Sequence, residues 1–346
     1  MNSDNSKYRF LTMPNIIDLF AGAGGLSLGF RLEKFNVLLS TDVDKDCEKT
    51  YLHNWKMENY LCKDIRAATL NEIERHINSR NVDVIVGGPP CKGFSTIGAR
   101  ASSNIKIRQR VDERNFLFKR FLEVVNHFRP EVVLFENVSG LLTFKNGEVF
   151  TLIKDGFKKI HYEVEDFLLD AVNYKVPQVR KRVFVVARKR KKPIGSPLPE
   201  VLNDISEYYK TVKDAIGDLA GKENLIENHV PLKHGLTNIR RYEFIPEGGR
   251  LPEDILPKEL FRKNFGNTFK RLDRNRPSLT IVPGHNAFPI HPWLHRSLTV
   301  REAARLQTFP DKIIFLGSRQ SQCLQVGNAV PINLARAWAR HIKCVL

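Results

Sequence analysis

A short apolar run that stops abruptly constrains this chain more than any other feature. Residues 82–86 have the composition of a buried parallel strand, and the following Gly-Gly-Pro-Pro ends it. Cys91 comes directly after. In an open α/β sheet, a side chain just past a strand lies in the crevice where ligands bind. We therefore predict that the Cys91 thiol is a nucleophile, the alternative being a buried structural cysteine.

Apolar runs and helical spacing alternate along the first half of the chain. This order predicts an α/β fold with a mostly parallel sheet and helices on both faces. The predicted strands are residues 15–19, 37–41, 82–86, 131–135, 164–169 and 182–186.

The alternation ends after Val186. Residues 193–292 are richer in Pro, Gly and Asn and show little periodicity, which predicts a second, smaller and irregular domain. Helical spacing resumes at residues 300–306. A last helix, predicted for 332–342, should return to the first domain. A length of 346 residues suits two domains.

The charge balance indicates a polyanionic partner. The chain has 55 Lys and Arg against 38 Asp and Glu, a net charge of +17. Nucleic acid is the usual partner of such a surplus, the alternative being a merely basic solvated surface. The sequence shows no membrane-length apolar run, no apolar leader and no C-x-x-C pair among its five cysteines. We expect a cytoplasmic protein without disulfides or bound metal.

Three features predict an adenosine cofactor. A Gly-rich loop follows the first strand, and Asp42, 18 residues past Gly24, can accept both ribose hydroxyls. Asp64 and Ile65 offer a carboxylate and an apolar contact for an adenine. Ser27 replaces the third glycine of the dinucleotide fingerprint, so the pattern does not require a pyrophosphate.

A carboxylate follows the fourth predicted strand. Glu136 should therefore share the crevice of Cys91, and beside a nucleophile it is expected to handle a proton. The alternative is a cap on the next helix.

At this point the chain resembles the DNA (cytosine-5) methyltransferase family, of the prokaryotic restriction-modification type. Six motifs occur in the family's order, and only residues 190–290 lack one. They lie at residues 18–29, 90–91, 136–138, 178–182, 301–307 and 327–331.

The resemblance implies a Rossmann-like class I methyltransferase domain of residues 1–189 and 312–346. Residues 190–311 would form the target-recognition domain. The implied activity is methylation of cytosine C5 within a specific double-stranded DNA sequence, with S-adenosylmethionine as methyl donor and no metal. We expect a monomer that serves as the modification enzyme of a restriction-modification system, paired in function with an endonuclease.

The resemblance also assigns residue roles. Cys91 would add to C6 of a flipped-out cytosine, Glu136 would contact N3, and Arg180 and Arg182 would hold the adduct. The residues implied around the cofactor are Phe20, Gly22, Gly24, Gly25, Asp42, Val43, Asp64, Ile65, Leu117, Asn328 and Val330.

One residue departs from the family pattern. Lys92 stands where Gln is usual, and its cation could contact a phosphate or lower the pKa of the Cys91 thiol. Three other functions stay open. An NAD-dependent oxidoreductase would leave Cys91 and Glu136 unexplained. A tRNA cytosine-5 methyltransferase of the same family would lack the large recognition region. A non-catalytic DNA-binding relative would not need both Cys91 and Glu136.

Overall fold

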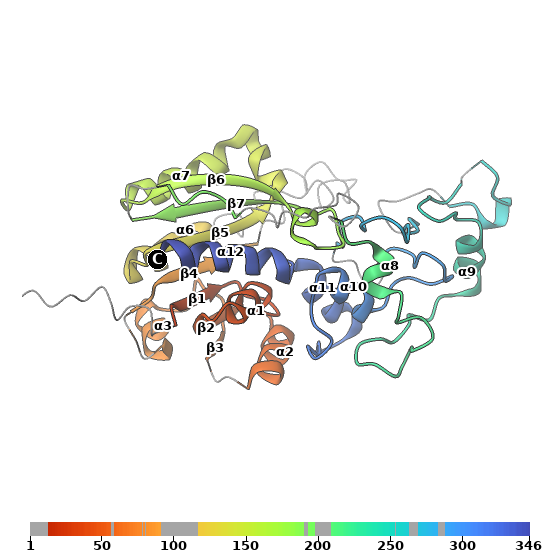
Figure 1. Ribbon diagram of the computed structural model, residues 1–346, viewed down its shortest axis with the longest axis horizontal. Helices are drawn as coiled ribbons and strands as arrows, with labels where there is room; N and C mark the ends of the chain where they lie inside the picture. The colour runs from red at the N-terminus through yellow and green to blue at the C-terminus, as the bar shows by residue number, and fades with distance from the viewer. Residues whose placement is uncertain are drawn as a thin grey trace, which may run out of the picture.

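The structure is a computed structural model of the chain (Figure 1). It describes residues 13–56, 59–77, 79, 81–90, 117–189, 193–197, 209–252, 254–262, 269–282 and 288–346.

The described strands form one seven-stranded sheet in the order β3-β2-β1-β4-β5-β7-β6. The first five are parallel to one another, whereas β7 runs antiparallel to both β5 and β6. The predicted mostly parallel sheet is therefore confirmed. The strands are β1 (Asn15–Leu19), β2 (Asn36–Asp42), β3 (Tyr60–Cys62), β4 (Val84–Gly87), β5 (Val132–Val138), β6 (Glu163–Asp170) and β7 (Lys181–Arg188).

Two features of the sheet differ from the sequence prediction. The edge strand β3 was not predicted, because three residues are too few to show a period. The prediction also ended the fourth strand before Glu136, but β5 continues to Val138. It continues because its last residues still pair with β7, which begins about 45 residues later in the chain.

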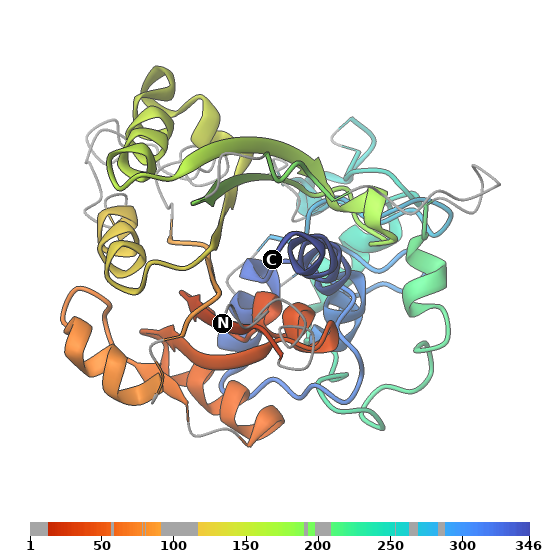
Figure 2. The ribbon, with the colours of Figure 1, turned by 60° about the vertical axis from the view of Figure 1, so that its left-hand side comes forward.

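Helices cover both faces of the sheet (Figure 2). On one face, α3, α6 and α7 pack in one hydrophobic cluster; on the other, α1 and α12 pack in a second. Short 3-10 turns follow β5 and β6. The helices are α1 (Gly25–Leu32), α2 (Lys45–Trp55), α3 (Leu70–Ile77), α6 (Leu117–Phe128), α7 (Glu148–Lys159), α8 (Val212–Ile216), α9 (Leu236–Glu243), α10 (Val300–Leu306), α11 (Arg319–Asn328) and α12 (Ile332–Val345).

The C-terminal helix returns to the first part of the chain, as predicted. It crosses α1 closely, because Gly29 has no side chain at the crossing: a Cβ there would lie 2.4 Å from Cβ of Ala335. Trp338, fully buried on α12, fills the space against Phe184 and Phe167 of the sheet. The end of the chain is thereby fixed against the sheet.

The junction between β1 and α1 contains a buried carboxylate. Asp18 accepts hydrogen bonds from the backbone N and the Oγ of Ser27, at 2.9 and 2.5 Å, and so caps the first turn of α1. The hydrogen-bonded chain continues through Ser40 to Tyr51. Burial raises the pKa of Asp18 from 3.8 to about 7.

The region between β7 and α10 carries the helices α8 and α9 and three isolated bridges, and a fourth bridge joins its Ser278 to Gln178, before β7. None of the named strands of the described chain lies in this region. Arg271 is buried within it and donates to four backbone carbonyls, including those of Tyr242 and His291.

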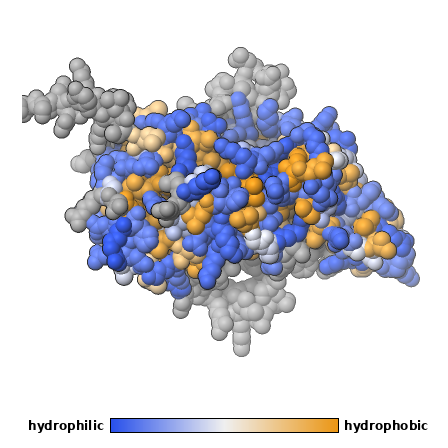
Figure 3. All heavy atoms as spheres, turned by 90° about the horizontal axis from the view of Figure 1, so that it is seen from below, coloured by the Kyte–Doolittle hydropathy of each residue, from blue (hydrophilic) through white to orange (hydrophobic). Residues whose placement is uncertain are grey.

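On the surface of this region, Leu225 and Leu236 are strongly exposed. The face in Figure 3 mixes hydrophilic and hydrophobic residues along its whole length. Among the described helices, none is both long and apolar enough to cross a membrane.

Replacing Gly29 with Ala should destabilise the protein, although Ala favours an isolated helix by about 1 kcal/mol over Gly. The added methyl would crowd Ala335 and the backbone N of Arg336, at 2.4 and 2.9 Å. Overpacking of this kind costs about 1–3 kcal/mol. Urea unfolding measures the change. Gly235→Ala, at the exposed N-cap of α9 where a Cβ would meet no heavy atom of the described chain within 4 Å, is the control without crowding. It should lower the midpoint less, by the modest cost of Ala at an N-cap.

Replacing Asp18 with Asn should change how stability depends on pH. The folded pKa of Asp18 is raised, so its contribution is fully present below about 4 and is lost as pH rises through about 7. Asn keeps an acceptor for Ser27 but cannot ionise. The wild type should therefore lose stability relative to Asp18→Asn between pH 5 and pH 8, as measured by thermal melting.

The matched control for this experiment is Asp64→Asn. Arg66 lowers the pKa of the half-buried Asp64, so this carboxylate is ionised throughout the tested range. Its substitution should shift the melting temperature equally at each pH. Parallel curves for the wild type and Asp18→Asn would contradict the assignment of a raised pKa to Asp18.

Candidate active site

Glu136 lies near the carboxyl end of β5, on the side of the sheet where all the parallel strands have their carboxyl ends. Its Cα pairs with Phe184 on the antiparallel β7, so Arg182 is its diagonal neighbour on the same face. The two side chains meet there: Nε of Arg182 lies 2.9 Å from Oε1 of Glu136. Both side chains are almost fully covered, which makes this a buried ion pair.

The environment of Glu136 favours retention of a proton. Burial raises the pKa of the Glu136 carboxyl above its ordinary value, while the positive charges of Arg182 and Arg180 oppose the rise. A carboxyl held between these opposing effects is suited to proton transfer.

The predicted nucleophile Cys91 and its neighbour Lys92 lie outside the described residues. The segment that leads to them is described as far as Pro90. Asn137, next to Glu136, donates from Nδ2 to the carbonyl of Pro89 at 3.2 Å. The end of β5 therefore holds the chain just before Cys91.

Arg180 is fully buried and joins three segments. Its Nη1 donates to the carbonyl of Ile281, and its Nη2 donates to the carbonyls of Gly327 and Ala329, all at 2.8 to 3.0 Å. Its Nε is buried and has no hydrogen-bond partner among the described residues. Arg180 and Arg182 are two residues apart but have different surroundings.

The Gly-rich loop has the backbone geometry that a close ligand needs. Phe20, Gly22 and Gly24 all have positive φ, at 60°, 54° and 83°. Gly22 donates its backbone N–H to Oδ2 of Asp42 at 2.9 Å, so the loop is tied to the end of β2. Oδ1 of Asp42 accepts from the backbone N of Val43 at 2.7 Å.

The surroundings of Asp42 fit an adenosine group. Val43, beside it, is apolar and 66% exposed, and a Cβ at Gly22 would meet no heavy atom of the described chain within 4 Å. Ile65 and Leu117 belong to one hydrophobic cluster, and Phe20 packs against it. The free space at Gly22, the exposed side chain of Val43 and the hydrogen-bonded carboxylate of Asp42 therefore lie together at the carboxyl end of β2.

The motif at residues 327–331 lies against the Gly-rich loop. A Cβ at Gly25 would lie 2.7 Å from the carbonyl oxygen of Val330, so the absence of a side chain permits this approach. Val330 is buried, whereas Asn328 at the end of α11 is exposed. The structure thus brings together two candidate segments that are about 300 residues apart in the sequence.

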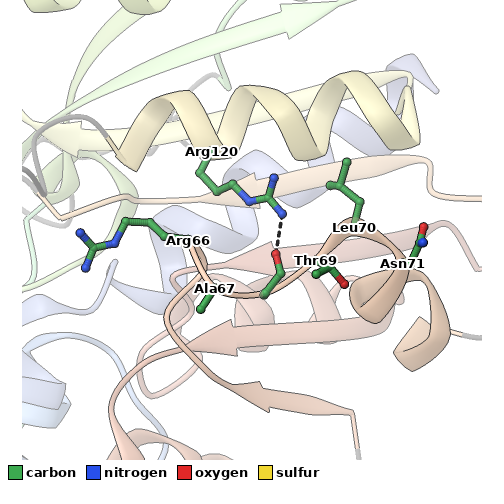
Figure 4. Close-up of a pocket in the computed structure, with 7 residues that line it drawn as sticks. Arg66, Ala67, Thr69, Leu70, Asn71 and Arg120 are labelled. Carbon is green, nitrogen blue, oxygen red and sulfur yellow. Dashed lines mark hydrogen bonds between the residues drawn. The ribbon is translucent and has the colours of Figure 1, made fainter.

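The Asp64 side chain faces a different neighbour. It is bound to Arg66, whose Nη2 lies 2.6 Å from its Oδ2. A surface hollow of about 400 Å³ begins at Arg66 and extends along residues 67–71 to Arg120 (Figure 4). Arg120 donates to the carbonyls of Ile65 and Ala68 and so ties the loop containing Asp64 to α6.

Several supporting residues were not predicted from the sequence. Asp18 caps α1 beneath the Gly-rich loop, and the hydroxyl of Tyr60 donates to the carbonyl of Gly22. Gln178, fully buried, donates to Gln307 and accepts from the backbone of Ile281. Their roles depend on partners distant in sequence. The sequence offered one signal for Asp18 and Gln178: each is a polar residue inside a family motif, at 18–29 and 178–182.

The model of the family described as C-5 cytosine-specific DNA methylase matches residues 14–344. The Type II methyltransferase M1.HphI of Haemophilus parahaemolyticus is 37% identical over 97% of this chain and 89% of its own length. The Type II methyltransferase M.DdeI of Desulfomicrobium norvegicum is 32% identical over 95% and 88%.

Solved structures agree in fold. An Escherichia coli protein described as a DNA modification methyltransferase encoded within a prophage superposes with a TM-score of 0.70, at 25% identity, over 96% of this chain and 99% of that chain. The Dnmt2 methyltransferase of S. pombe, 18% identical, gives 0.66 over 96% and 99% and supports the fold alone. The chain therefore belongs to the C-5 cytosine-specific DNA methylase family and is a DNA (cytosine-5) methyltransferase.

Proposed function

We propose that this methyltransferase modifies C5 of one cytosine within a specific double-stranded DNA sequence, as the modification enzyme of a restriction-modification system. The observation that carries the proposal is the buried Glu136–Arg182 pair at the edge where β4 leads to Cys91. The names of the relatives M1.HphI and M.DdeI support the restriction-modification role.

The chemistry requires covalent activation, because C5 of cytosine is a poor nucleophile. In the proposed reaction the Cys91 thiolate forms a bond to C6, and Glu136 gives a proton or hydrogen bond to N3, which takes up the electron pair. Bound S-adenosylmethionine would supply the methyl group for C5, with S-adenosylhomocysteine as the leaving group. A base then removes the C5 proton, the returning electron pair expels Cys91 as the thiolate, and N3 gives its proton back to Glu136.

Two arginines support this step in different ways. Arg182 holds Glu136 at 2.9 Å and keeps its carboxyl oriented. Arg180 orders the segments around it and has one buried N–H, on Nε, without a partner in the described chain. We assign to both arginines the holding of the adduct, through the base O2, Glu136 or a phosphate.

The methyl donor would be held by the Gly-rich loop and its neighbours. Asp42 suits the ribose hydroxyls, because its carboxylate is already oriented by backbone N–H groups. Phe20, Ile65 and Val43 suit the adenine, and the backbone near Asn328 closes the site beside Gly25. The other glycines permit close approach of the ligand.

The DNA would lie across both parts of the chain. We divide it into a catalytic part, residues 1–189 and 312–346, and a target-recognition part, residues 190–311. A net charge of +17 suits phosphate contacts. The target cytosine must leave the stacked duplex to reach Glu136. We further propose a cytoplasmic monomer that acts alongside an endonuclease.

The proposal is tested first by activity. Bisulfite sequencing of plasmid DNA from an expressing host should show one methylated sequence, and tRNA from that host should stay unmodified.

Cys91→Ala should abolish methylation without weakening S-adenosylmethionine binding, because the thiol acts only on the base. Glu136→Gln should slow turnover by about 10²–10⁴-fold, the usual share of a proton-transferring group. Wild-type turnover of either variant would remove that residue from the mechanism.

The second test traps the covalent intermediate. A duplex with 5-fluorocytosine at the target should form a denaturation-resistant adduct with the enzyme, because fluorine cannot leave C5 as a cation. The adduct should require S-adenosylmethionine and should not form with Cys91→Ser. Cys344→Ser, which changes an exposed cysteine, is the matched control and should still form it. Methylation of normal DNA without any adduct would contradict the role of Cys91.

A further inference from the structure

The carboxylate of Glu136 lies between two neighbouring strands. On one side is Arg182 of β7, at 2.9 Å. On the other side is the end of β4, where Gly87 pairs in parallel register with Phe135. Gly88 is the next residue along and therefore lies beside Glu136. Side chains at adjacent positions of a sheet point to the same face.

Gly88 leaves the space that the carboxylate occupies. A Cβ at this position would lie 2.6 Å from Oε2 of Glu136 and 3.4 Å from its backbone oxygen. The φ of Gly88 lies outside the left-handed region, so an L side chain would meet no backbone strain. The conflict is therefore with the far end of one side chain.

The preceding glycine differs in this respect. A Cβ at Gly87 would lie 2.2 Å from the backbone oxygen of Leu19, on the neighbouring β1. A methyl group there must displace a strand, and the sheet would be destabilised. At Gly88 the same methyl group can be accommodated if the carboxylate moves.

We propose that Gly88 is a positioning residue for the reaction: the space left by its missing side chain holds the Glu136 carboxylate against Arg182. The inference rests on the proposed function of Glu136. It adds that the carboxylate is fixed on both sides, by an ion pair with β7 and by close packing against Gly88, directly after β4. Gly88 is therefore required for the position of the proton-handling group, whereas Gly87 is required for the approach of β1.

The experiment compares Gly88→Ala in two backgrounds, the full-length wild type and Glu136→Ala. In the wild type, the methyl should move the carboxylate and lower kcat about 10²-fold, the cost of a misplacement of roughly 1 Å. The affinity for S-adenosylmethionine should be unchanged. In the Glu136→Ala background, the same substitution should not lower kcat further, because there is no carboxylate to displace.

Stability provides a readout that does not depend on activity. Gly88→Ala should lower the melting temperature in the wild type and leave it unchanged in Glu136→Ala. Folding only in the Glu136→Ala background would also support the contact. Gly87→Ala should destabilise both backgrounds, because its conflict is with Leu19. Gly235→Ala, at the exposed N-cap of α9, should shift the melting temperature equally in both.

The outcomes separate the two proposals. Wild-type turnover and stability of Gly88→Ala would overturn the positioning role, as would equal losses in both backgrounds. Wild-type turnover of Glu136→Ala would instead overturn the proton role of Glu136. In that case the melting temperatures would still decide whether Gly88 holds the carboxylate.

Discussion

The buried guanidinium of Arg180 is the interaction on which the arrangement of the site depends. A cation removed from water is costly unless acceptors surround it, and here backbone carbonyls provide them. They come from Ile281, between α9 and α10, and from Gly327 and Ala329 at the end of α11. Together with the bonds of Gln178 to Gln307 and Ile281, this contact ties both segments to the chain just before β7. Arg182, two residues further on, reaches Glu136 because that strand start is fixed.

The antiparallel direction of β7 explains why a motif at the start of a strand belongs to a site made from strand ends. In a parallel sheet, carboxyl ends gather at one edge, and ligands bind there. Because β7 runs against β5, its amino end lies at that same edge, and Val138 pairs with Arg182. A parallel β7 would have placed Arg182 at the far edge, away from Glu136. The direction of a single strand thus completes the charge pair.

Local sequence patterns predicted the parts of the fold that local forces determine. The bounds of β1 and α10 agree with the prediction to the residue, because an apolar run and a capped helix carry their own signals. Glu136 was predicted past its strand, since the partner that extends β5 lies far away in sequence. Arg180 and Arg182 looked equivalent for the same reason. Their partners distinguish them. Arg180 donates to the carbonyls of Ile281 and Gly327, whereas Arg182 pairs with Glu136, and no local pattern connects these residues.

The two glycines before Cys91 illustrate how one motif meets two spatial demands. The sequence alone indicates a strand stopped by turn-forming residues. In the structure, β4 lies between β1 and β5, and each neighbour crowds a different glycine: the Leu19 carbonyl faces Gly87, and the Glu136 carboxylate faces Gly88. Side chains there would either separate the strands or move the carboxylate. The segment before Cys91 must therefore lack side chains at both Gly87 and Gly88, so that β1 can approach on one side and β5 on the other.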